Sequence, residues 1–74
     1  MNYRVINTKT GASLVVNEHG FASLIASHTA LMSPMLGAIE ANIIRDSVMN
    51  GGWESAARGM RIEKTSENVT YTGN

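Results

Sequence analysis

The sequence predicts an α+β fold, in which a small antiparallel sheet made of two hairpins carries one or two helices on one face. Three observations lead to this prediction. Apolar and polar residues alternate near both ends of the chain, an uncharged stretch with helical periodicity lies between them, and turn-forming residues separate these regions. The length of 74 residues suits one small domain over residues 1–74, with the element order β-β-α-α-β-β.

The N-terminal region predicts the first hairpin, with strands over residues 2–8 and 12–16. Tyr3 and Val5 alternate with Arg4 and Ile6, as side chains on the two faces of a strand do. A second run of residues with high β propensity ends at Val16. The polar segment between the strands ends in Gly11, which can adopt the left-handed conformation that closes a short hairpin. Residues 17–20 are then expected to form a turn.

Residues 21–32 have the periodicity of a helix, with one face formed by Phe21, Leu24, Ile25, His28, Leu31 and Met32. Ser33 and Pro34 fit the N-cap and first turn of a second helix that ends near Asn50. The apolar set of this second helix is Met35, Leu36, Ile39, Ile43, Ile44 and Val48. The alternative is one helix over residues 21–49 with a kink at Pro34. We favour two helices because Ser33 is a good cap.

The C-terminal region predicts a second hairpin. Residues 53–58 are expected to form a short helical turn closed by Gly59. Alternation then predicts strands over residues 60–64 and 69–72, and Ser66, Glu67 and Asn68 supply the turn between them.

Composition excludes several classes of function. There are 6 basic and 6 acidic residues, so the net charge is zero, and there is no cysteine. These counts argue against a disulfide scaffold, a cysteine-based zinc site and a strongly basic nucleic-acid binder. His19 and His28 have no matching carboxylate cluster, and no nucleophile motif is present. We therefore expect no enzyme activity, no cofactor and no metal site.

Two alternatives come from particular segments. Arg58, Arg61 and Lys64 could contact phosphates in a weak nucleic-acid-binding regulator, but the nearby Glu54, Glu63 and Glu67 cancel their field. Residues 21–39 contain no charged side chain and are long enough for a single membrane span. Pro34, His28 and the serines weaken that interpretation.

Small residues recur at a spacing of four on both helices: Ala22, Ala26 and Ala30 on the first, Gly37 and Ala41 on the second. Such rows allow close helix packing. Because the helices hold more apolar surface than a small sheet can cover, we expect a homodimer or a heteromeric complex. A glutamate at Ala26 should then cost a few kcal/mol if that site is buried.

These observations favour a non-enzymatic protein-binding module, an inhibitor or regulator of a larger host protein in the cytoplasm. In size the chain is typical of small accessory proteins of phages and mobile elements, which commonly bind one host protein stoichiometrically. Trp53 would anchor the interface, with apolar helix residues around it and arginines on its rim. The expected partner-binding residues are Trp53, Arg58, Arg61, Met35, Ala26 and Ala30.

Overall fold

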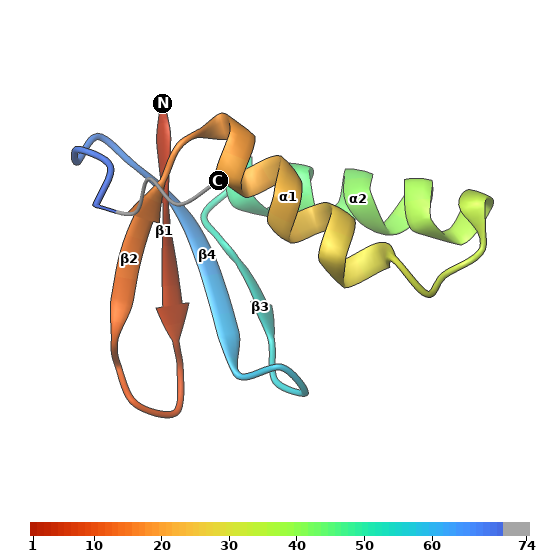
Figure 1. The fold of residues 1–74 in the computed structure, drawn as a ribbon, viewed down its shortest axis with the longest axis horizontal. Coiled ribbons are helices and arrows are strands. Elements are labelled where there is room, and N and C mark those ends of the chain that lie inside the picture. The colour runs from red at the N-terminus through yellow and green to blue at the C-terminus, as the bar shows by residue number, and fades with distance from the viewer. Residues whose placement is uncertain (71–74) are drawn as a thin grey trace.

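One antiparallel sheet carries both helices on the same face in the computed structural model, which describes residues 1–70. The strand order is β2-β1-β4-β3, and every neighbouring pair is antiparallel (Figure 1). The predicted α+β class, with its sheet of four strands and its helices on one face, is confirmed. In chain order the elements are β1 (Asn2–Asn7), β2 (Ser13–Val16), α1 (Glu18–Thr29), α2 (Pro34–Met49), β3 (Trp53–Ser55) and β4 (Met60–Thr65).

The first hairpin forms as the sequence predicts. Asn7 folds the loop, since its side-chain oxygen accepts hydrogen bonds from the backbone N–H groups of Lys9 and Thr10, at 2.9 and 3.2 Å. Gly11 has φ +79°, the left-handed conformation expected of it. The strands then pair so that Tyr3 lies opposite Val16.

α1 begins at Glu18, earlier than expected, because Asn17 caps it. The Asn17 Oδ1 atom accepts a hydrogen bond from the Gly20 N–H at 2.9 Å. Val16 before the cap and Phe21 in the first part of the helix both lie in the core, the arrangement of a hydrophobic staple. The prediction of a turn at residues 17–20 is therefore wrong, because these residues are the cap and first turn of the helix.

Two separate helices are confirmed. Ser33 caps α2, its Oγ accepting a backbone hydrogen bond at 3.4 Å, and Pro34 is the first helical residue. α1 ends at Thr29 instead of Met32, and residues 30–33 turn the chain before α2 starts at Pro34. Leu31 and Met32 consequently lie in the connecting loop, and both are exposed. The prediction that they belong to the helical face over residues 21–32 is wrong, because α1 ends before them.

Residues 53–58 do not form the expected helical turn. Trp53–Ser55 is instead the edge strand β3, with Trp53 opposite Ile62 of β4. Gly59, at φ +63°, closes the hairpin between β3 and β4. The predicted partner strand over residues 69–72 is wrong for residues 69 and 70, which are not in a strand, while Tyr71 and Thr72 lie outside the described residues.

Thr70 lies beside β2, the edge strand on the other side of the sheet from β3. The Thr70 N–H donates to the Val15 carbonyl at 3.0 Å, and the Val15 N–H donates to Thr70 Oγ1 at 2.8 Å. The outer edge of β2 is thereby partly paired within the chain, which lowers its tendency to pair with other strands.

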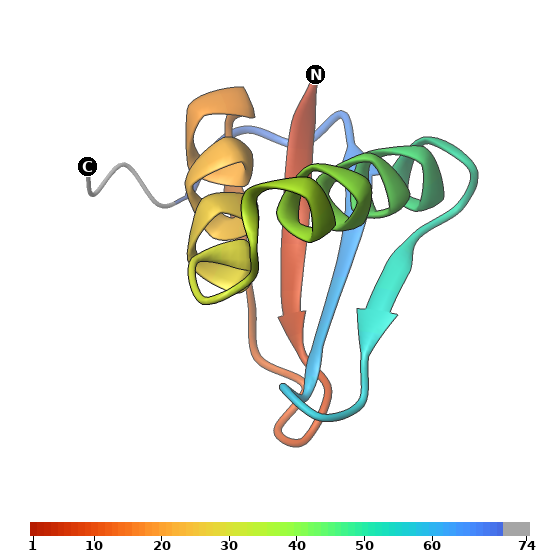
Figure 2. The ribbon, with the colours of Figure 1, turned by 90° about the vertical axis from the view of Figure 1, so that its right-hand side faces the viewer.

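The core lies between the helices and one end of the sheet. Figure 2 shows both helices in front of the upper part of the strands, while the lower part of the sheet extends beyond them. Tyr3 and Phe21 stack with ring centroids 4.1 Å apart at the centre of this layer. The buried cluster consists of Tyr3, Val16, Phe21, Ile25, Ile44, Val48 and Ile62.

Candidate protein-interaction surface

A row of large apolar side chains lies exposed on α2. Met35, Ile39 and Ile43 follow one another at a spacing of four, so they form one ridge along the helix, and Leu36 lies beside them. Leu31 and Met32, in the loop before α2, are also exposed, Leu31 fully. We call Leu31, Met32, Met35, Leu36, Ile39 and Ile43 the α2 apolar face.

The wide apolar arc predicted for α2 therefore divides into two sides. Ile44 and Val48 are buried against the sheet, whereas Ile43, the neighbour of Ile44, is 49% exposed. The N-terminal part of α2 and the loop before it project sideways from the sheet (Figure 1). Of the six apolar residues expected along α2, Ile44 and Val48 pack in the core, and the other four are exposed.

The two rows of small residues have different surroundings. Gly37 faces α1, because a Cβ atom there would lie 3.6 Å from Thr29 Cβ, and Ala41 packs against the core. Ala26 and Ala30 are exposed. A glutamate at Ala26 is thus solvated in the single chain, so the expected cost from burial does not apply to the isolated molecule.

The charged groups nearest to the α2 apolar face along the helix are paired within the chain. Glu40 lies 2.9 Å from His28 Nε2, and Arg45 Nη1 donates to Glu18 Oε1 at 2.7 Å. Residues 21–39 carry no charged side chain. The face is therefore suited to apolar contacts and offers a partner few sites for ion pairing.

His28 joins the two helices to β3. Its Nε2 atom contacts Glu40 on α2, and its ring lies edge-on to Trp53 with centroids 5.1 Å apart. His28 Nδ1 is buried and has no hydrogen-bond partner among the described residues. His28 is half-buried, and one of its ring nitrogens is hydrogen-bonded. His19 lies exposed in the first turn of α1.

Trp53 takes part in the same junction. It is half-buried and packs against the core as well as against His28. The structure thus places Trp53 at the inner side of the helical hairpin, with only part of its ring available to a partner.

The three basic residues of the C-terminal region do not converge. Arg61 is held by Glu63, with Nε 3.0 Å from Oε2, and its Nη2 donates to the Gly51 carbonyl at 3.1 Å. Lys64 follows on the opposite side of β4, since side chains alternate along a strand. Arg58 lies in the β3–β4 turn. Phosphate contacts from all three side chains at once are therefore disfavoured.

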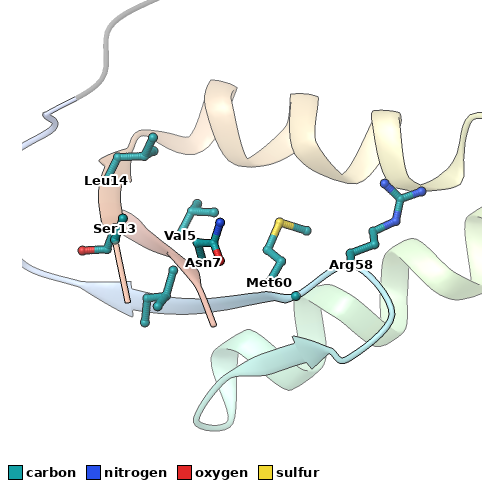
Figure 3. A pocket seen from close by; sticks show the side chains of 9 residues that line it. Val5, Asn7, Ser13, Leu14, Arg58 and Met60 are labelled. Carbon is teal, nitrogen blue, oxygen red and sulfur yellow. The ribbon is translucent and has the colours of Figure 1, made fainter. Parts of the chain in front are cut away.

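A concavity of about 320 Å³ lies where the sheet extends beyond the helices. Figure 3 shows Val5 and Met60 pointing from the sheet into the space below α1, with Leu14 at one end and Arg58 at the other. Its lining is mostly apolar. Arg58, which is expected on the rim of an interface, lies at the edge of this concavity.

A hydrogen-bonded group fixes the start of α1 to the sheet and to α2. The Tyr3 hydroxyl donates to Glu18 Oε2 at 2.6 Å, and Arg45 binds the other carboxylate oxygen. The hydroxyl of Tyr3, and next the guanidinium of Arg45, lower the pKa of Glu18. The hydrogen bond to Glu18, and next burial, raise the pKa of Tyr3.

This group predicts a loss of stability in acid. The pKa of Glu18 is lower in the folded than in the unfolded chain, so its stabilisation is present above the ordinary pKa of 4.5 and is lost as the pH falls through the folded-state value. We expect Tyr3→Phe to lower the free energy of unfolding by about 1 kcal/mol at pH 6. The difference from wild type should shrink below pH 4.5, as measured by urea unfolding. A difference that stays constant in acid would contradict this account.

Two further findings bear on the function classes considered. In the part of the chain that the structure describes, no helix is long and apolar enough to cross a membrane. Within residues 1–70, no three or more His, Asp or Glu side chains gather as a metal site would require. Comparison of the chain with protein-family models, with curated proteins and with solved structures finds no match.

Proposed function

We propose that this chain is a non-enzymatic protein-binding module, which regulates a larger protein stoichiometrically by covering part of its surface with the α2 apolar face. The observation that carries the proposal is the exposure of six large apolar side chains on α2 and in the loop before it. Apolar patches on monomeric proteins seldom exceed about 300–600 Å², and larger ones generally mark interaction sites. Because the chain has no cysteine, it suits a reducing compartment, and we propose the cytoplasm.

The composition of the face fits docking on an apolar groove or helix. The central Ile39 can be fully desolvated in a complex, as the residues that dominate binding energy usually are. Met32 and Met35 add flexible side chains that adapt to the shape of a partner. The paired Glu40 and Arg45 lie beside this region and need not lose their intrachain partners on binding.

A matched pair of variants tests the proposal. Ile39 and Met49 lie on the same helix and are 50% and 51% exposed, but Met49 lies outside the α2 apolar face. Tagged wild type and Met49→Lys should capture the same protein from the native cells in a one-to-one complex that re-forms from purified components. Ile39→Lys should lose it.

Salt separates apolar docking from phosphate binding. A complex made by the α2 apolar face should persist as salt is raised, whereas phosphate contacts weaken steeply. Equal capture by Ile39→Lys, or a bound nucleic acid released by salt, would contradict the proposal.

A further inference from the structure

The single chain leaves its helical hairpin incompletely covered. Only Phe21 and Ile25 of α1, and Ile44 and Val48 of α2, are buried. The residues of the α2 apolar face remain exposed. No other segment among residues 1–70 covers them. A domain of this size, with no disulfide, commonly gains stability by association.

We propose that in the free protein a second copy of this chain covers the α2 apolar face, with the two α2 helices packed antiparallel about a two-fold axis near Ile39. The pairing rests on the geometry of the exposed face. Its regulatory consequence rests on the proposed function, since one face cannot bind a second copy and a target at the same time.

The area of the face matches what a dimer needs. By their exposed fractions, its six side chains present on the order of 700 Å² on each copy, close to the roughly 800 Å² that each partner contributes to a stable interface of standard size. A smaller patch of scattered apolar residues would not reach this value. The second copy supplies an equal apolar area without any additional partner.

The order of residues along α2 is compatible with two-fold symmetry. Ile39 is the middle residue of the ridge formed with Met35 and Ile43, which lie four residues before and after it. An antiparallel pairing therefore places Ile39 opposite Ile39, and Met35 of each copy opposite Ile43 of the other. Ridges of this spacing are the ones that interdigitate in the commonest class of helix packing.

Charge does not oppose this pairing. The only charged residues on α2 are Glu40, Arg45 and Asp46, and the first two are paired within the chain. Asp46 lies seven residues after Ile39, so symmetry places it opposite Met32 and next to the start of the other α2, whose own first turn has no acidic residue. A carboxylate near a helix N-terminus is favourable.

Self-association is tested by sedimentation of the purified chain from micromolar to high-micromolar concentration. Wild type and Met49→Lys should reach twice the chain mass of 8.0 kDa. Ile39→Lys should dimerise at least about tenfold more weakly, with an unchanged far-ultraviolet spectrum, because Ile39 is exposed in the single chain. Wild type that stays monomeric, or Ile39→Lys that dimerises like wild type, would overturn the proposal.

Because the chain has no cysteine, one introduced thiol reports on the axis. Ile39→Cys should oxidise to a covalent dimer far faster than Met49→Cys, since a disulfide needs Cα atoms within about 7 Å of each other. Equal rates would overturn the antiparallel placement. A monomeric wild type that still captures its target through Ile39 would refute the dimer and leave the proposed function intact. A dimeric wild type that captures no target would support the dimer and refute the proposed function.

Discussion

Replacing Ile44 with alanine should lower the free energy of unfolding by about 3 kcal/mol, within the range of roughly 2–5 kcal/mol for large-to-small substitutions in a core. Ile44 is 1% exposed and belongs to the cluster that joins α2 to the sheet. A chain of this length has a total stability of only about 4–11 kcal/mol at the usual value per residue. The variant should therefore unfold at much lower urea concentration, as followed by far-ultraviolet circular dichroism.

The adjacent Ile43 is the matched control for Ile44. It is the same residue type on the same helix but is 49% exposed, so Ile43→Ala should change the stability of the monomer by less than about 1 kcal/mol. Both substitutions are best made in the Ile39→Lys background, where loss of a dimer contact cannot add to the effect. Equal losses from the two substitutions would contradict the division of α2 into a buried and an exposed side.

The sequence was sufficient for those elements whose local chemistry and tertiary role agree. The alternation of Tyr3 and Val5, the turn from Asn7 to Gly11 and the Ser33 cap all predict what the structure shows. The start of α1 was missed because Gly20 disfavours a helix and masked the capping role of Asn17. Val16 and Phe21 carry the signal that could have revealed it, since they flank the cap at staple spacing.

β3 was missed for a different reason. It has three residues and carries too little alternation to be distinguished from a turn. Its strand conformation comes from pairing with β4, where Trp53 lies opposite Ile62. That contact depends on the path of the whole chain, so the wrong hairpin partner was assigned to β4.

For the candidate surface, the sequence predicts the amount of uncovered apolar helix surface but not its location. The sequence indicates more apolar helix surface than the sheet can cover, and this surplus is the α2 apolar face. Periodicity gives α2 one wide apolar arc and does not say which part of it meets the sheet. That depends on the placement of Phe21 and Tyr3 in the core and on the side toward which Gly37 and Ala41 turn.

Gly20→Ala should destabilise the protein by up to about 2 kcal/mol, although alanine is normally better than glycine within a helix by about 1 kcal/mol. A Cβ atom at Gly20 would lie 2.8 Å from Val16 Cβ. Val16 is buried, lies in β2 opposite Tyr3 and cannot move aside, so the helix start must shift. Overpacking of this kind costs about 1–3 kcal/mol, and the gain in helix propensity offsets only about 1 kcal/mol of it.

Gly37→Ala is the matched control for Gly20→Ala, and its effect should have the opposite sign. The nearest atoms to a Cβ at Gly37 are Thr29 Cβ at 3.6 Å and the Thr29 carbonyl oxygen at 3.7 Å, which are ordinary contacts. The substitution should therefore stabilise the protein by about 0.5–1 kcal/mol. Thermal unfolding should show a midpoint raised by several degrees for Gly37→Ala and lowered for Gly20→Ala, at about 4–8 °C per kcal/mol. If both variants were stabilised, α1 would have to begin after Gly20, where the periodicity of the sequence had placed it, and Val16 would not pack against its first turn.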